Sequence, residues 1–195
     1  MIIDFEFSST VANYRLLSNT ITPRPIAWVS SINANGVVNL APFSFFGVVS
    51  SVPPIFSLCF SPKSDGTPKD TLQNLKSTKC ATISLVMVDF LERLEQSASE
   101  VESHKSEASV FGIELNSVES SYPPVPKGVR VAYFCELREI LDLSAYNVTA
   151  LLQAKKCFVD DEIYKEDLRF LPPHLGRVGK YYLQAKEVID PNIKD

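Results

Sequence analysis

The chain has 195 residues, 45% of them hydrophobic, which is enough to bury the core of one domain, and we expect that domain to span residues 1–195. Lysine and arginine number 19 against 23 aspartates and glutamates, so the formal net charge is −4 and the pI is near 5.3. This balance argues against a general nucleic-acid binder and against a protein held on acidic membranes by charge.

The cysteines, the histidines and the N-terminus exclude further classes. The four cysteines form no Cys-x-x-Cys pair and are expected as buried free thiols, with a redox or metal role as the alternative. Two histidines are too few for a His-rich metal site, so no metal is expected. Asp4 and Glu6 stand where a secretory signal would be basic, and the apolar window Leu40–Phe60 is interrupted by prolines. We therefore expect a cytoplasmic protein without a membrane segment.

The first third of the chain predicts strands joined by tight turns. Ile26–Ile32 is rich in β-branched and aromatic residues, as strands are. Asn33-Ala-Asn-Gly36 is a strong hairpin signal, because Asn and Gly tolerate the positive φ angles of such turns. Val37–Leu40 is the expected partner strand, and Ile55–Phe60 is a further buried strand.

Two short helices and a polar segment are expected next. Thr67 can cap a helix with Pro68 in its first position and Asp70 in its third, and this helix should reach about Ser77. Asp89-Phe-Leu-Glu92 predicts the second helix. Residues 99–110 are polar and predict a surface loop and short helix whose carboxylates face solvent.

The remaining chain adds strands and no repeat. Cys80–Val88, Val129–Leu141, Tyr146–Val159 and Lys180–Ile189 are the expected strands. About seven strands therefore outnumber two or three helices without alternating with them, which disfavours a doubly wound parallel sheet. We predict a mainly β fold with helical insertions, a mostly antiparallel barrel.

The loop before the first of these helices has the features of an anion site. A helix N-terminus offers unpaired N–H groups and a partial positive charge, which suit a phosphate. Lys69 adds a full cation, and Ser61, Ser64 and Thr71 add hydroxyl donors. An ordinary capped helix with a solvated lysine would give the same pattern. Neither a P-loop nor a dinucleotide-binding glycine fingerprint is present.

A second unusual stretch is Asn39-Leu-Ala-Pro-Phe-Ser-Phe-Phe46. Pro42 cannot donate to a sheet, so the strand must end, bulge or lie at an edge there. Neighbouring backbone groups are then free to meet a flat, polar-rimmed ring such as a flavin. A bulged strand whose aromatics fill the core is the alternative.

The sequence indicates no catalytic acid, base or nucleophile. No Ser/His/Asp or Cys/His arrangement stands out. His174, close to Gly176-Arg-Val-Gly179, could meet a substrate or a nicotinamide. A solvent-exposed loop histidine is the alternative.

Three motifs in order resemble the flavin reductase-like family, which includes flavoredoxin and the flavin reductase components of two-component monooxygenases. They are Arg24-Pro-Ile-Ala-Trp-Val-Ser-Ser31, Asn39-Leu-Ala-Pro-Phe-Ser-Phe-Phe46 and Asp65-Gly-Thr-Pro-Lys-Asp-Thr71. The resemblance extends from about Tyr14 to Tyr182. The late glycines depart from the family pattern, because Arg177 and Val178 separate Gly176 from Gly179.

The resemblance implies an FMN-binding split β-barrel that forms a homodimer, with flavin near the subunit interface. Ser30 and Ser31 would approach the ribityl-phosphate end. The ring would be lined by Asn39, Ala41, Ser44 and Phe45. The phosphate pocket would be formed or ordered by Ser61, Lys69, Asp70 and Thr71. His174 and Tyr181 would lie near the substrate.

The implied function is an FMN-dependent oxidoreductase of the NAD(P)H:flavin reductase type, with NADH or NADPH as donor. Its hydride would pass to flavin N5, and the flavin itself carries that chemistry. A partner oxygenase or electron-transfer protein would receive the electrons. The alternatives are a flavin-binding electron carrier or flavin store without NAD(P)H turnover, and a split-barrel relative that binds pyridoxal phosphate or haem.

Overall fold

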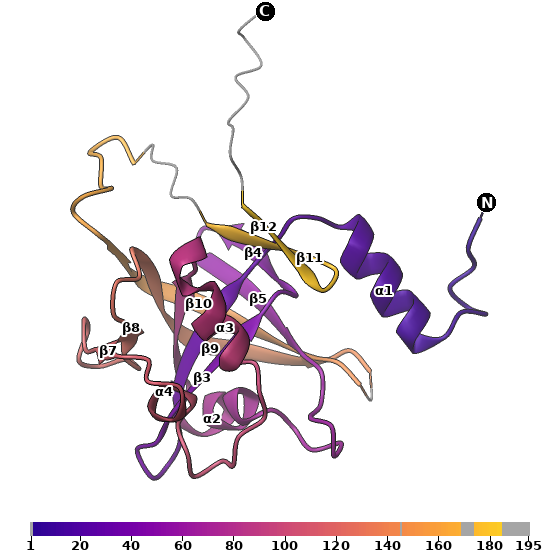
Figure 1. Ribbon diagram of the computed structural model, residues 1–195, viewed down its shortest axis with the longest axis horizontal. Helices are drawn as coiled ribbons and strands as arrows, with labels where there is room; N and C mark the ends of the chain where they lie inside the picture. Colours follow the sequence, from indigo (N-terminus) through magenta and orange to yellow (C-terminus); the bar gives the residue numbers. More distant parts are fainter. Residues whose placement is uncertain (1, 145, 169–173, 185–195) are drawn as a thin grey trace, which may run out of the picture.

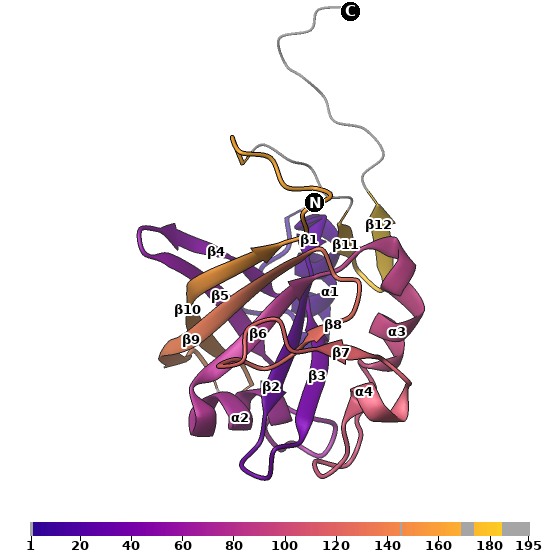
Figure 2. The same ribbon diagram turned by 90° about the vertical axis from the view of Figure 1, so that its left-hand side faces the viewer.

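The computed structural model of the protein describes residues 2–144, 146–168 and 174–184, and an antiparallel sheet of seven strands dominates it (Figure 1). The strand order is β3-β2-β6-β9-β10-β5-β4, and Figure 2 shows the sheet curving from β4 round to β3. These strands are β2 (Ala27–Ile32), β3 (Val38–Phe43), β4 (Phe46–Ser51), β5 (Pro54–Phe60), β6 (Cys80–Leu85), β9 (Val131–Asp142) and β10 (Val148–Val159). Strands β3 and β4 are the two edges of the hydrogen-bonded ladder.

Two small sheets and five helical segments complete the described structure. β1 (Arg24–Pro25), β11 (Leu175–Val178) and β12 (Tyr181–Gln184) form one small sheet, and β7 (Leu115–Asn116) pairs with β8 (Val125–Pro126) in the other. The helices are α1 (Thr10–Thr20), α2 (Asp70–Thr78), α3 (Leu91–Gln96) and α4 (Glu107–Val110), with a 3-10 turn, η1, at Val88–Phe90. None of the helices in the described ranges is long and apolar enough to cross a membrane. The mainly β, antiparallel fold with helical insertions is confirmed.

The first hairpin forms where the sequence predicts it. Asn33 accepts hydrogen bonds on its side chain from the N–H groups of Asn35 and Val37, and Gly36 takes the positive φ of the turn. The hairpin sets β2 against β3 with Ser31 opposite Asn39 and Val29 opposite Ala41. β3 is longer than predicted and continues through Pro42, which is possible because β3 is an edge strand.

Strand β2 is buried on both faces because a different core covers each face. Alternate residues of a strand point to opposite sides. Ala27 and Val29 pack with residues of β5, β6 and α2 in one core, whereas Ile26 and Trp28 pack with residues of α3 and α4 in the other. β2 therefore holds its neighbour β3 in a fixed position relative to α2 on one side and α3 on the other.

Three expectations about the elements are corrected or extended. The sequence Tyr14-Arg-Leu-Leu17 predicts a short turn or helix. The helix found there, α1, is longer and runs from Thr10 to Thr20, and Ser9 caps it by accepting from the Ala12 N–H. β4 was not anticipated, because its run of glycine, valine and serine lacks a clear alternation. β12 ends at Gln184, and the rest of the strand expected to Ile189 lies outside the described residues.

Candidate functional site

A groove follows β3 on the side where α2 and the segment after α3 approach it. Two adjoining pockets make it up, and they share Asn39, Lys63, Asp70, Glu100 and Val101. The outer pocket encloses about 660 Å³ and reaches towards the β2–β3 turn. The inner pocket is lined by Ala41–Phe43 on one wall and by 97–101 on the other. We call these two pockets together the β3 groove.

The outer edge of β3 is closed by a carboxylate and a proline. The Leu40 N–H donates to Oε2 of Glu107 at 2.9 Å, so the even-numbered residues of β3 turn their backbone groups away from β2. Pro42 lies on the same side and has no N–H. Glu107 is only 4% exposed, and burial raises the pKa of its carboxyl group. The backbone wall of the groove is thus held in place by a buried side chain from α4.

The odd-numbered side chains of β3 face α2. Asn39 Nδ2 donates to Thr71 Oγ1 at 2.8 Å, and on the neighbouring strand Ser31 Oγ accepts from Asn74 Nδ2 at 3.0 Å. All four side chains are buried. These two bonds dock the first turns of α2 onto the hairpin, and buried polar groups paired in this way fix one arrangement of the elements.

Helix α2 begins two residues later than predicted, so the expected capping box at Thr67 is wrong. The side chain of Asp65 accepts from both the N–H and the hydroxyl of Thr67, at 2.9 and 2.6 Å. This local turn places Thr67 outside the helix. Asp70 is the first helical residue, and Lys69 precedes it without any side-chain cap.

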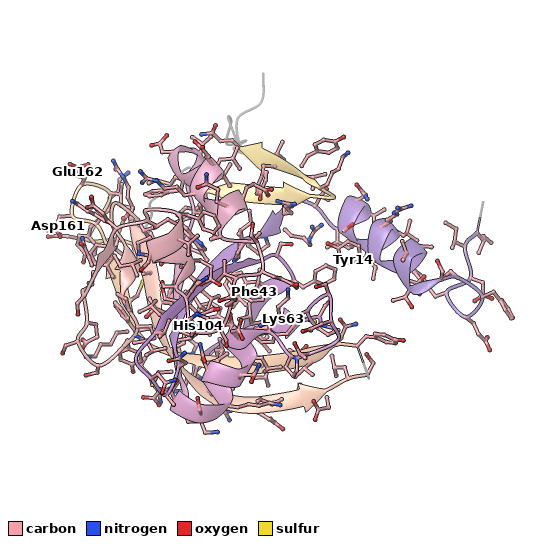
Figure 3. All side chains as sticks on the ribbon, turned by 60° about the horizontal axis from the view of Figure 1, so that its bottom comes forward. Tyr14, Phe43, Lys63, His104, Asp161 and Glu162 are labelled. Carbon is pink, nitrogen blue, oxygen red and sulfur yellow. The ribbon has the colours of Figure 1, made fainter. Side chains whose placement is uncertain are left out.

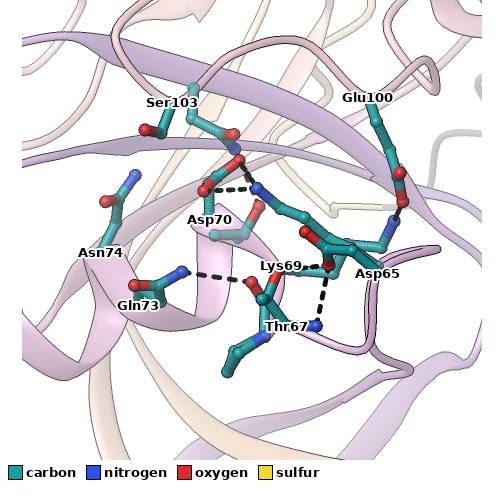
Figure 4. A network of polar contacts seen from close by, with 12 residues as sticks. Asp65, Thr67, Lys69, Asp70, Gln73, Asn74, Glu100 and Ser103 are labelled. Atoms are coloured by element: carbon teal, nitrogen blue, oxygen red, sulfur yellow. Dashed lines mark hydrogen bonds and ion pairs between the residues drawn. The ribbon is translucent and has the colours of Figure 1, made fainter.

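The two lysines at this end of the groove each face a carboxylate (Figure 4). Lys63 pairs with Asp70 at 2.7 Å and Lys69 with Glu100 at 2.8 Å. Glu100 also accepts from the N–H of Ser64 at 3.1 Å and from its hydroxyl at 2.5 Å. The hydrogen bonds from Lys69 and Ser64 lower the pKa of Glu100 to about 2, so it is ionised at neutral pH. One anionic group thus already sits among the donors expected to hold a phosphate.

A third pocket of about 220 Å³ continues from the inner end of the groove towards α1 and the β11–β12 hairpin. It shares Pro42, Phe43 and Ala98 with the β3 groove. Figure 3 shows Tyr14 on α1 at one side and Phe43 and Lys63 at the centre of the molecule. The other lining residues of this pocket are Ile26, Ser44, Glu95, Arg177 and Tyr182. We call it the Arg177 pocket.

The structure brings together about half of the residues expected at the site. Asn39, Ala41, Lys69, Asp70 and Thr71 all line the inner pocket. Ser31 lies behind them through its bond to Asn74, and Ser44 lines the Arg177 pocket.

Five expected residues lie elsewhere. Ser30 is on the opposite face of β2 from Ser31, and its hydroxyl donates to the Pro124 carbonyl at 2.6 Å. The Ser61 hydroxyl donates to Asn147 Oδ1 at 3.2 Å. Phe45 stacks on Tyr14, with ring centroids 5.7 Å apart. His174 forms a β-bridge with Met87, where burial lowers its pKa, and Tyr181 is exposed beneath Lys180. None of these five lines the groove or the Arg177 pocket.

The site also contains residues that sequence reasoning missed. The expectation that the carboxylates of 99–110 face solvent is wrong for Glu107, which is buried, and Glu100 contacts the groove. Lys63, Arg177 and Tyr182 were not predicted as site residues. Tyr182 could have been found from strand alternation, since an exposed Tyr181 turns its neighbour inwards. The two glutamates carry no local signal, because their partners are more than 30 residues away.

Comparison with known proteins gives consistent matches. The sequence matches the family described as flavin reductase like domain over residues 19–169. YwrF of Bacillus subtilis is 31% identical over 186 residues, with 89% of each chain covered. The structure of 2-nitrobenzoate 2-nitroreductase NbaA from Pseudomonas fluorescens superposes with a TM-score of 0.88 at 25% identity, covering 100% of this chain and 96% of that one. Nitrilotriacetate monooxygenase component B from Bacillus cereus superposes with a TM-score of 0.89 at 22% identity, covering 97% and 98%.

Proposed function

Because the chain belongs to the flavin reductase-like domain family, we propose that it is an FMN-binding oxidoreductase of the NAD(P)H:flavin reductase type. The observation that carries the proposal is the β3 groove, which has lysines and a helix N-terminus at one end and an apolar wall at the other. FMN has the same polarity, with a phosphate at one end and a flat ring at the other.

The polar end of the groove can hold a phosphate if the phosphate displaces the carboxylate of Glu100. Lys69, the Ser64 N–H and the Ser64 hydroxyl already converge on one carboxylate. A phosphate is a stronger acceptor of such charge-assisted bonds than a carboxylate and gains from the nearby N-terminus of α2. Lys69 and Thr71 are the residues we assign to phosphate, with Glu100 as the group that is displaced.

We assign the other end of the groove to the ring. Ala41, Pro42 and Phe43 form a wall at the strand edge, and Ser44 follows at its end. When bound, FMN supplies the N5 atom that accepts a hydride. The chain has only to hold the ring against β3, exclude water from one face and leave the other face open to a donor. This division of labour explains why the described residues of the groove contain no Ser/His/Asp or Cys/His arrangement.

Anaerobic reduction tests this function. The FMN-loaded protein is mixed with NADH and separately with NADPH, and the flavin absorbance is followed. Rapid bleaching by one of them is the expected result. A bound flavin that neither nucleotide reduces would point to an electron carrier or store, and failure to bind FMN at all would refute both. A partner oxygenase is part of the proposal, and component B of the nitrilotriacetate monooxygenase has the same fold.

We also propose that the protein acts as a homodimer through α1 and β4. The two elements and the residues that directly follow them expose large apolar side chains: Val11, Tyr14, Leu17, Ile21, Val48, Val49 and Val52. The two elements are neighbours, because Tyr14 of α1 stacks on Phe45 just before β4. An apolar surface of this extent is typical of an interface.

Charged residues on this surface should separate the subunits. Val48 is 73% exposed and Val52 is 89% exposed, so Val48→Glu with Val52→Glu is expected to leave the fold intact and shift the protein from dimer to monomer in sedimentation velocity. Val110→Glu, at an exposed valine on α4, is the matched control and should remain dimeric. A wild-type protein that sediments as a monomer at micromolar concentration would contradict the proposal.

A further inference from the structure

Two arginines lie directly opposite each other beside the Arg177 pocket. Strand β1 pairs with β11 so that Arg24 faces Arg177, and side chains of such a pair lie on the same side of the sheet. Like charges directly opposite one another destabilise a sheet. Local rules of this kind are broken mainly where function requires it.

Arg24 is a buried cation without an anionic partner among the described residues. It is 6% exposed, and no carboxylate in the described ranges forms an ion pair with it. Its Nη1 donates to the Ser18 carbonyl, its Nη2 lies 3.4 Å from Ser44 Oγ, and its guanidinium lies 5.5 Å from the centre of the Phe45 ring. Its Nε is buried with no hydrogen-bond partner. A buried charge left in this state is costly, which favours an anion nearby.

Arg177 has a partner that fixes it in the pocket without cancelling the local charge. Its Nη1 donates to Glu95 at 2.6 Å, and its guanidinium lies 4.2 Å from the centre of the Tyr182 ring. Tyr182 donates its hydroxyl to the same carboxylate. These hydrogen bonds lower the pKa of Glu95, so it remains ionised. Two arginines against one glutamate leave one positive charge at this end of the pocket.

The Arg177 pocket is small, and apolar side chains form part of its lining. Ile26, Pro42 and Phe43 line it together with the rings of Tyr14 and Tyr182. Its volume of about 220 Å³ is below the range of roughly 300–1,000 Å³ typical of drug-sized ligands, so it suits a single ring better than a whole dinucleotide. Pro42 and Phe43 also line the β3 groove.

We propose that the Arg177 pocket binds a small aromatic carboxylate, with the ring against Pro42 and Phe43 and the carboxylate on Arg177. Arg24 does not line the pocket, but its positive charge, next to Ser44 in the pocket wall, adds to the attraction for the carboxylate. The proposal rests on the proposed function, since it places this substrate class beside the wall assigned to the flavin ring. It adds to that function a recognition site for an organic anion.

Calorimetric titration of the FMN-loaded protein with benzoate tests the site. Benzamide has the same ring without the charge, and acetate has the charge without the ring. Benzoate should bind at least tenfold more tightly than either. Arg177→Gln should weaken benzoate binding at least tenfold, whereas Glu95→Gln, which removes the opposing charge, should strengthen it. Lys180→Gln removes a cation from the same hairpin outside the pocket and should change nothing.

The outcomes separate this inference from the proposed function. Equal affinity for benzoate and benzamide, or an Arg177→Gln variant that is folded by circular dichroism and binds benzoate normally, would overturn the aromatic carboxylate. ADP is titrated in parallel. If Arg177→Gln weakens the binding of ADP and leaves the binding of benzoate unchanged, the arginines bind a phosphate of the dinucleotide and the inference fails. Normal FMN binding without benzoate binding refutes only the inference. Absence of FMN binding refutes the proposed function.

Discussion

Trp28→Ala is expected to lower the free energy of unfolding by about 3–5 kcal/mol, the usual cost of removing a buried aromatic side chain. Trp28 is fully buried in the core beneath α3, and its ring lies 5.8 Å from that of Phe90. Its Nε1 donates to Ser97 Oγ at 2.9 Å, and Ser97 in turn donates to the Leu94 carbonyl. The substitution therefore removes packing and also releases the segment that forms one wall of the β3 groove.

Denaturant unfolding followed by circular dichroism measures this loss, because Trp28 is the only tryptophan and its fluorescence disappears with it. Ser97→Ala is the matched control. It leaves the ring in place but removes the acceptor of the buried Trp28 Nε1–H, which costs about 1–3 kcal/mol. If Trp28→Ala cost no more than Ser97→Ala, the side chain would matter only for its hydrogen bond.

The second large effect is expected at Lys69. Lys69→Ala should weaken FMN binding by about 1–3 kcal/mol, or roughly 5- to 150-fold, the scale of a charge-assisted hydrogen bond. Riboflavin lacks the phosphate and should bind the variant and the wild type equally well. Fluorescence quenching of each flavin during titration gives both affinities.

Glu100→Gln sharpens the same experiment because it should change affinity in the opposite direction. The glutamate competes with phosphate for Lys69 and Ser64, and its lowered pKa keeps it charged at neutral pH. The Glu100→Gln variant, which lacks this charge, should therefore bind FMN more tightly than the wild type. Lys76→Ala, at an exposed lysine near the other end of α2, is the control. Unchanged FMN affinity in Lys69→Ala would refute the phosphate assignment.

Short-range signals predicted the parts of the fold that short-range forces determine. The turn at 33–36 needs residues that accept positive φ and self-bonding side chains, and both are visible in the sequence. The start of α2 was predicted wrongly although it is also local. Asp65 binds both the N–H and the hydroxyl of Thr67 in a local turn, and the sequence does not show whether this turn or a helix begins there.

The candidate site could be predicted only in part, because much of it depends on contacts between distant segments. Except for Lys63, the inner-pocket residues from Asn39 to Thr71 lie on the motifs that carry the family resemblance. Alternation along β2 already implies that Ser30 and Ser31 cannot face the same ligand. Glu107 and Arg177 come from separate regions of the chain, and only the folded arrangement brings them to Leu40 and Arg24.

The closed edge of β3 also protects the protein from association through its sheet. Exposed edge strands can recruit a strand from another molecule and so begin aggregation. Of the three positions on β3 that face outwards, Leu40 already donates its N–H to Glu107 and Pro42 has none to donate. A foreign strand would therefore find no continuous row of partners there. β3 can therefore border a ligand groove without providing an edge to which further strands could add.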